Sequence, residues 1–391
     1  MRLGILATHP IQYHAPLYRA LAEHLDLQVY FAHQQTAQGQ ADAGFGVAFD
    51  WDVPLLDGYQ HRFLDNVAKA PGTESFRGCD TPEIAGIIEY ERFDAFLVNG
   101  WNTRSFWQAM RACWRTGTPL IVRGDSQLNT PRRWWLRAAK EVVYRAFIPR
   151  FDAYLTVGTR AREYYLHYGA RPERMFFVPH FVDNDFFAAR AEQARRNRAA
   201  LRERYALHPE RPIALFVGKF IPVKRPLDFV EALARLSHRM PGVQGVMVGE
   251  GPMRPEIEAA CERAGAPISL LGFFNQSEMP EAYALADALV LPSETETWGL
   301  VVNEAMACGL SAVVSDAVGC APDLIEPGLT GYSFPVGDVA ALATMLERTL
   351  TGYGTAAVHE AVAGKMRIYS LRTAAEGALE AVHCMAATQQ P

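Results

Sequence analysis

Two glutamates eight positions apart, Glu296 and Glu304, lie around the start of an expected helix in the second half of the chain. We expect Thr295 or Thr297 to cap this helix, and Gly309 to end it in a left-handed conformation. The first N–H groups of a helix attract anions, phosphate above all, so the carboxylates beside them need another ligand. Hydroxyl groups of a sugar or a ribose would suit them.

Two lysines, Lys219 and Lys224, follow Gly218 at the end of an expected buried strand. Two cations on a tight loop can hold a diphosphate from two sides, although solvated surface lysines would look the same in the sequence. Because the carboxyl ends of parallel strands meet at one edge of a sheet, we expect both lysines beside the helix of Glu304. This position favours the phosphate site.

Two other motifs give weaker signals. The stretch 248–252 follows a strand and contains Gly-Glu-Gly, but neither half has a Gly-x-Gly-x-x-Gly after its first strand, which argues against an NAD enzyme. Asp50 and Asp52 match a metal-binding Asp-x-Asp triplet only superficially, because such triplets are common by chance. We therefore expect no bound metal.

The composition is that of an ordinary globular protein, with 49% hydrophobic and 21% charged residues among 391, a length that favours two domains. A net charge of -5 gives no general attraction to nucleic acid. The six cysteines are scattered without a Cys-x-x-Cys pair, which favours a reducing compartment and argues against disulfides and structural zinc. The apolar start, residues 1–7, is too short for a signal peptide, and no apolar run reaches the length of a membrane span.

Short buried strands alternate with helices in both halves, a pattern that predicts two parallel sheets covered by helices on both faces. Residues 33–58 show no period and should form long loops. The alternation breaks at 179–187 and restarts at 213, after a stretch dense in Arg and Glu. The expected strands are 3–7, 27–32, 95–99, 119–123, 153–157 and 175–178 in the first half, and 213–218, 245–249, 268–271, 288–291 and 311–315 in the second.

With these motifs the second half resembles the retaining family 4 glycosyltransferases of the GT-B fold. Glu296 and Glu304 match the family's Glu-x7-Glu pair, and Lys219 and Lys224 match its basic pair at a strand edge. Further matches fall in the family's order at 249–252, 271–274, 318–325 and 328–331.

The resemblance implies an α/β fold of two facing, doubly wound, Rossmann-like domains with a cleft between them and a C-terminal crossover helix. It places an N-terminal acceptor-side domain at 1–187, a linker and charged helix at 188–211, and a nucleotide-sugar-binding domain at 212–365. The C-terminal helix, 366–391, would pack back on the first domain.

The resemblance also implies roles for single residues. Lys219 and Lys224 would neutralise the diphosphate of the donor, Glu296 would contact the transferred sugar, and Glu304 would accept the ribose hydroxyls. Members of the family generally need no metal or other cofactor, because basic residues stabilise the leaving diphosphate. The implied catalytic residues are Lys219, Lys224 and Glu296, and the implied donor-binding residues are Gly218, Glu250, Phe273, Phe274, Trp298, Gly299, Leu300, Val301 and Glu304.

The first half matches the family less closely, and its site residues stay open. The usual Gly-Gly loop after the first strand is replaced by a loop with His9 and His14, which either bind acceptor or donor phosphates or fill the loop. Many members carry a histidine after the strand 119–123 that contacts the donor sugar. This chain has Arg123 and Asp125 there as candidate substitutes, so these four residues are the acceptor-side candidates.

The stretch 131–150 holds six basic residues, one acid and two tryptophans. Basic amphipathic helices with interfacial aromatics bind anionic lipid surfaces, which predicts peripheral membrane contact. The alternative is a helix packed on the sheet, with its tryptophans and tyrosine in the core.

The resemblance, together with these features, implies a cytoplasmic retaining glycosyltransferase, peripheral at the inner face of the membrane. It would transfer a sugar from a nucleotide sugar to a saccharide or lipid-linked saccharide acceptor, in the synthesis of a cell-surface polysaccharide such as lipopolysaccharide. No nucleic acid is expected as a partner. Two alternatives remain: a nucleotide-sugar epimerase or hydrolase of the same fold, and a non-catalytic nucleotide-sugar sensor.

Overall fold

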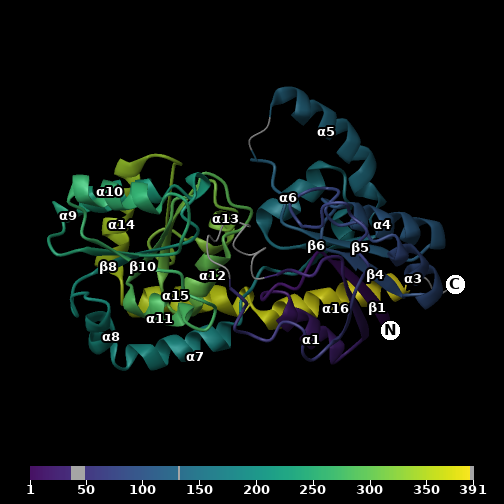
Figure 1. Ribbon diagram of the computed structural model, residues 1–391, viewed down its shortest axis with the longest axis horizontal. Coiled ribbons are helices and arrows are strands. Elements are labelled where there is room, and N and C mark those ends of the chain that lie inside the picture. The colour runs from purple at the N-terminus through teal and green to yellow at the C-terminus, as the bar shows by residue number, and fades with distance from the viewer. Residues whose placement is uncertain (37–48, 131–132, 388–391) are drawn as a thin grey trace. The chain divides into compact units, whose positions relative to one another are not determined.

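The computed structural model describes residues 1–36, 49–130 and 133–387 (Figure 1). These residues form two compact units. The first unit comprises 1–36, 54–180 and 371–387, and the second unit comprises 49–53 and 181–370. Each unit holds one parallel sheet, so the chain has the predicted α/β fold.

The first unit is built on a seven-stranded parallel sheet in the order β3-β2-β1-β4-β5-β6-β7. The order reverses between β1 and β4, as in doubly wound folds, where ligands bind at the carboxyl ends of the strands. The strands are β1 (Arg2–Ala7), β2 (Asp26–Phe31), β3 (Gln60–Phe63), β4 (Ala95–Val98), β5 (Leu120–Gly124), β6 (Ala153–Thr156) and β7 (Met175–Phe177).

Helices cover this sheet, and one of them comes from far along the chain. The helix α16 (Leu371–Ala387) packs on β7, β6 and β4 and beside α1 (Ala15–Ala22), where Figure 1 shows it in yellow. A Cβ at Gly377 would lie 2.0 Å from the carbonyl oxygen of Phe177, so only glycine allows this close approach. The other helices are α3 (Glu83–Glu91), α4 (Arg104–Thr116), α5 (Trp134–Phe147) and α6 (Thr159–His167).

The second unit holds a six-stranded parallel sheet in the order β10-β9-β8-β11-β12-β13. Its strands are β8 (Ile213–Val217), β9 (Gln244–Val248), β10 (Ile268–Gly272), β11 (Ala288–Leu291), β12 (Ser311–Ser315) and β13 (Gly331–Phe334). Its helices are α7 (Asn184–Arg195), α8 (Arg198–Arg204), α9 (Pro226–Ser237), α10 (Arg254–Ala264), α11 (Met279–Leu285), α12 (Leu300–Ala307), α13 (Ala321–Leu324), α14 (Val339–Gly352) and α15 (Ala356–Ile368).

Every strand expected from the alternation is present, with ends that differ by at most one residue. The strands β3 and β13 and the helices α3, α13, α14 and α15 were not expected. The side chains of β3 are mostly exposed at the edge of the sheet, so this strand lacks the apolar run of a buried one. The predicted loop 33–58 falls partly outside the described residues.

Candidate active site

In the second unit, the turn that contains Glu296 and the helix α12 follow β11 at the carboxyl edge of the sheet. The predicted threonine cap is wrong, because the residue before α12 is Gly299, with φ 101° and no side-chain hydrogen bond to the helix. The chain must enter the helix through a left-handed residue, which a threonine adopts only at a cost. Gly309 follows the end of the helix with φ 82°, as predicted.

The buried side chain of Trp298 hydrogen-bonds to the first turn of α12. Trp298 is 4% exposed, and its Nε1 donates a hydrogen bond of 2.8 Å to Oδ1 of Asn303, one turn into α12. Its ring lies 5.7 Å from that of Tyr369. The indole therefore belongs to the core of the second unit.

The structure brings Lys224 and Glu296 together. Lys224 ends a short 3-10 turn after β8, and its Nζ forms an ion pair with Oε2 of Glu296. Both side chains are largely shielded from water, at 22% and 19% exposure. A backbone hydrogen bond of 2.8 Å from Glu294 to Val223 ties the two loops together. The predicted basic loop and the predicted sugar-contacting glutamate thus form one cluster beside the start of α12.

Glu304 lies inside the second unit, at 2% exposure, on the first turns of α12. The hydroxyl of Tyr283, on α11, donates a hydrogen bond of 2.5 Å to Oε2 of Glu304. A buried carboxylate needs such donors, because burial otherwise penalises its charge. Tyr283 therefore fixes the position of the carboxylate that the resemblance assigns to ribose binding.

The loops after β8 and β9 approach each other closely around Lys219. Gly218 donates to the carbonyl of Val248 at 3.1 Å, and Phe220 donates to that of Glu250 at 2.8 Å. Lys219 thus lies between two backbone hydrogen bonds that join the loops. Lys219 comes two residues after the end of β8, so it lies at the same edge of the sheet as Lys224.

Three other predicted donor-side residues have partners within the second unit. The carboxylate of Glu250 forms an ion pair with Arg254 on α10. The ring of Phe273 lies 4.6 Å from that of Phe49, and the ring of Phe274 lies 6.0 Å from that of Tyr205. The two phenylalanines follow β10, next to β9 in the sheet.

The Asp50–Asp52 triplet packs on the segment that follows these phenylalanines. The carbonyl of Asp50 accepts a hydrogen bond of 2.9 Å from Nδ2 of Asn275, and the carboxylate of Asp52 accepts from Ser277. Asp52 thus has a local structural partner. Within the described ranges, no group of three His, Cys, Asp or Glu side chains is placed to hold a metal ion.

In the first unit, Arg123 brings together two histidines at the carboxyl edge of the sheet. Arg123 is the fourth residue of β5, His14 precedes α1, and His180 follows β7. Nη1 of Arg123 lies 3.2 Å from Nε2 of His14, and Nη2 lies 3.4 Å from Nδ1 of His180. Oδ2 of Asp125 lies 3.9 Å from Nε2 of His180. Three of the four acceptor-side candidates therefore share one cluster.

The electrostatics of this cluster follow from its burial. Burial, and then the charge of Arg123, hold the pKa of His14 well below its usual range. Burial also lowers the pKa of His180, against an opposing hydrogen bond with Asp125. Both imidazoles are therefore neutral near pH 7.

The fourth candidate, His9, whose charge also contributes to the lowered pKa of His14, lies in the loop after β1. Its Nδ1 is 3.0 Å from the hydroxyl of Thr8, and burial, with a contribution from His33, lowers the pKa of His9 to about 4. A neutral histidine with a local hydrogen bond fits the loop-filling alternative as well as a binding role.

Sequence reasoning missed two residues of these clusters, His180 and Tyr283. His180 stands just past a predicted strand, which is the one signal that places it at the carboxyl edge. Tyr283 lies in a helix that was expected, but nothing in its sequence neighbourhood points to Glu304.

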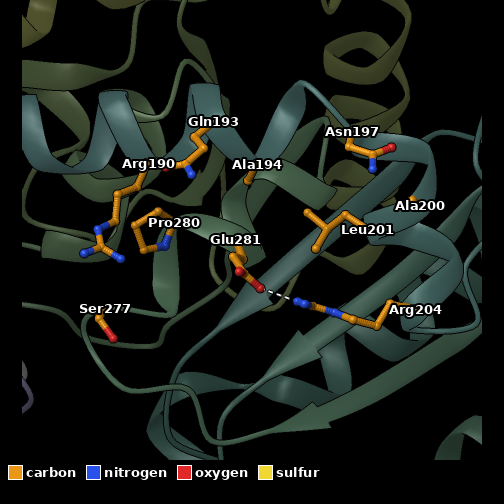
Figure 2. Close-up of a pocket in the computed structure, with 10 residues that line it drawn as sticks. All are labelled: Arg190, Gln193, Ala194, Asn197, Ala200, Leu201, Arg204, Ser277, Pro280 and Glu281. Carbon is orange, nitrogen blue, oxygen red and sulfur yellow. Dashed lines mark hydrogen bonds and ion pairs between the residues drawn. The ribbon is translucent and has the colours of Figure 1, made fainter.

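A polar groove of about 470 Å³ lies elsewhere in the second unit, between α7, α8 and the start of α11 (Figure 2). An ion pair between Arg204 and Glu281 spans it, and Arg190 and Ser277 lie toward its other end. None of the predicted site residues lines this groove.

Two protein-family models match the chain. A model described as glycosyl transferases group 1 matches residues 197–360, and one described as glycosyltransferase family 4 matches residues 12–186. The chain belongs to this glycosyltransferase family. The resemblance found in the second half is thereby confirmed and extends to the first half.

The chain is similar to alpha-D-kanosaminyltransferase of Streptomyces kanamyceticus, with 33% identity over 243 residues. The match covers 60% of the chain and 62% of the relative, which is less than two thirds of the relative's length.

Two solved structures share the fold of this chain. A glycosyltransferase from Rickettsia africae superposes with a TM-score of 0.74 at 18% identity, covering 98% of each chain. Anabaena HepE, solved in complex with UDP and glucose, superposes with a TM-score of 0.68 at 16% identity, covering 98% of this chain and 100% of its own. These likenesses support the predicted GT-B class of fold.

Proposed function

We propose that the protein is a retaining glycosyltransferase that moves a sugar from a nucleoside-diphosphate sugar to a hydroxyl group of a glycan or glycolipid acceptor. The observation that carries this proposal is the cluster of Lys224, Glu296 and the uncapped start of α12. A helix start and a lysine attract a diphosphate, and a carboxylate beside them suits the hydroxyls of a sugar.

In this mechanism the diphosphate leaves with growing negative charge as the bond to the sugar breaks. Lys219, Lys224 and the N–H groups from Trp298 to Val301 stabilise that charge, which is the main electrostatic task of the reaction. Glu296 positions the transferred sugar, and Glu304 holds the ribose. The reaction then needs no metal ion, because basic side chains take its place.

The test is release of nucleoside diphosphate from a panel of UDP-, GDP- and ADP-sugars, before and after dialysis against EDTA. We expect one donor to be turned over, with a rate unchanged by EDTA. Binding of a donor without release would indicate the sensor alternative. NMR of the product should show the anomeric configuration of the donor; inversion would refute the retaining assignment, and an epimerised nucleotide sugar would favour the epimerase.

We place the reaction in the cytoplasm, in the synthesis of a cell-surface polysaccharide. All six cysteines lie in the described part of the chain and are present as thiols, which supports a reducing compartment. The acceptor class is an analogy with the family, so a lipid-linked saccharide is tested as acceptor beside its lipid-free form.

We also propose that α5 contacts an anionic membrane surface. Of its 14 residues, one, Phe147, is buried. Trp135 and Val142 are seven positions apart, as are Leu136 and Val143, so these exposed side chains form one apolar stripe. Their exposed fractions are 49%, 74%, 42% and 56% in that order, and Trp134 is 81% exposed. An exposed stripe of this kind on a basic helix favours lipid over the core-packed alternative.

Co-sedimentation with vesicles tests this contact. We expect the protein to pellet with phosphatidylglycerol vesicles at low salt, to stay in solution with phosphatidylcholine, and to be released by high salt. The double change Trp135→Ser and Val142→Ser should abolish pelleting, while Val67→Ser, at a residue 54% exposed on the same unit, should not. An absence of pelleting in the unchanged protein would refute the proposal. Among the helices of the described residues, none is long and apolar enough to cross a membrane.

A further inference from the structure

Arg123 is a buried cation at the carboxyl edge of the first unit's sheet, with an exposed fraction of 6%. A guanidinium can only donate hydrogen bonds, so the two imidazole nitrogens that face it must act as acceptors. This assigns the ring proton of His14 to Nδ1 and that of His180 to Nε2. Burial, and then the charge of Arg123, lower the pKa of both imidazoles, so both histidines are neutral and neither balances the charge of Arg123.

The positive charge of Arg123 has no close counter-ion. Within the described part of the chain, Arg123 forms no ion pair with a carboxylate. The nearest acid in its field is Asp125, whose carboxylate lies on the far side of His180 and is 42% exposed. A buried, unneutralised cation is unfavourable, because burial removes it from water without a compensating charge.

The spare hydrogen-bonding capacity of this cluster consists of donors. Nε of Arg123, Nδ1 of His14 and the hydroxyl of Tyr165 are buried and have no hydrogen-bond partner among the described residues. The Tyr165 hydroxyl lies over the end of β5, since a Cβ at Gly124 would be 3.0 Å from it. A charged donor and two neutral donors gathered at one sheet edge match an oxyanion in charge and in hydrogen-bonding character.

We propose that Arg123, His14 and Tyr165 form a subsite for an oxyanion, either phosphate or carboxylate, carried by a substrate. The subsite would neutralise Arg123 and use the three donors. The affinity of the subsite for an oxyanion does not depend on the proposed function. The assignment of that oxyanion to a glycosyl acceptor or to the sugar of the donor rests on the proposed function.

The direct test is a titration of histidine-labelled protein with inorganic phosphate at pH 8, followed by NMR. The His14 ring signal is assigned by its loss in His14→Gln. We expect phosphate to shift this signal, and Arg123→Met to weaken the apparent affinity about tenfold to a hundredfold, because a charge-assisted hydrogen bond is lost. Arg115→Met, which removes an exposed arginine paired with Glu89 on the same unit, should leave the titration unchanged. A His14 signal that phosphate does not move, or that moves equally in Arg123→Met, overturns the subsite.

Tyr165→Phe gives a second test if the Arg123 variant fails to fold. The change removes a buried hydroxyl that has no partner among the described residues, so the urea midpoint should stay equal or rise. Phosphate affinity should nevertheless fall. A lower midpoint with unchanged phosphate affinity would instead indicate a structural hydroxyl and contradict the proposal.

Turnover distinguishes the two sources of the oxyanion. If it belongs to the donor sugar, Arg123→Met should lower turnover of a nucleoside-diphosphate uronate more than that of the matching neutral sugar. If it belongs to the acceptor, the variant should lower both equally, and transfer to a phosphorylated acceptor should lose its advantage over the neutral one. Absence of any donor turnover in the unchanged protein would refute the proposed function, while the phosphate titration would still report on the subsite.

Discussion

Lys224 and Glu296, 72 residues apart in the sequence, form an ion pair in the second unit. Under the proposed function each of them serves a different part of the donor: the lysine the diphosphate and the glutamate the sugar. Their mutual contact keeps both side chains in place and their charges balanced. If the proposed function holds, donor binding redirects the lysine toward phosphate and releases the glutamate toward the sugar hydroxyls.

Lys224→Ala should lower kcat/KM for the nucleotide sugar by about a hundredfold to a thousandfold, because a preorganised charge facing the leaving diphosphate is lost. Lys69→Ala, at an exposed lysine of the first unit, serves as the control. Steady-state release of nucleoside diphosphate measures both. A rate for Lys224→Ala close to that of the control would mean that the catalytic cluster lies elsewhere.

Tyr283→Phe removes the hydroxyl that donates to the buried Glu304 carboxylate. We expect a loss of about 1–3 kcal/mol in the free energy of unfolding, since a hydrogen bond to a charged group is broken. Affinity for the nucleoside diphosphate should fall with it, because the carboxylate is no longer fixed. Urea unfolding and calorimetric titration measure the two effects, with Tyr90→Phe, at a tyrosine 85% exposed, as the control. Equal stability of both variants would contradict this role of Tyr283.

Gly249→Ala tests the close approach of the loops around Lys219. The new Cβ would lie 1.9 Å from the carbonyl oxygen of Gly218, at a backbone φ of 146°. We expect destabilisation by at least about 3 kcal/mol, since the backbone must shift. Gly265→Ala, with φ 59° and open space around it, should cost only about 1–2 kcal/mol through the left-handed conformation. Comparable urea midpoints for the two variants would argue against the clash.

Acid should weaken the fold through its buried histidines. The folded state keeps His9 neutral down to a pKa of about 4, whereas an unfolded histidine takes up a proton near its usual 6.5. The unfolded state therefore binds more protons in this window, so stability is full above pH 6.5 and falls as the pH drops toward 4. Burial lowers the pKa of His14 and His180 too, and their effect has the same sign.

Urea unfolding at pH 7 and pH 5 measures this loss. We expect His9 alone to contribute about 1–2 kcal/mol between the two values. His9→Gln should reduce the difference by that amount, and His359→Gln, at an exposed position, should leave it unchanged. The same pH dependence in all three proteins would exclude His9 as a source.

The strands were predictable because both faces of most of them are buried. Residues 288–291, Ala-Leu-Val-Leu, form the fully buried β11, and an apolar run of this length between turns has few other interpretations. The edge strand β3, Gln-His-Arg-Phe, keeps its side chains mostly in water and carries no such signal. The helix start at Gly299 was misassigned to a threonine because cap preferences are statistical, while the backbone geometry after β11 requires a left-handed residue.

The contacts within the clusters could not be predicted, because they depend on how distant segments meet. The pairing of β8 with β11 brings the loop of Lys224 to Glu296, and no local pattern encodes that register. Asp287 shows the same limit. Its carboxylate accepts hydrogen bonds from Arg198 and Arg202 of α8 and from the N–H of Ile213, and nothing in the sequence around Asp287 indicates these partners. Two arginines of the basic stretch before the second sheet, Arg198 and Arg202, therefore bind a buried carboxylate instead of facing only solvent.

The helix α16 has a consequence for the order in which the protein is made. Its buried face, on Leu371–Ala387, completes the core of the first unit against β7, β6 and β4. A ribosome produces these residues only after the whole of 181–370, which belongs to the second unit. The second unit can therefore finish folding while the first still exposes the apolar surface that α16 will cover. The first unit is therefore the first to be synthesised and the last to be completed. We expect chaperones to bind the nascent chain mainly at the exposed face of the sheet at β4, β6 and β7.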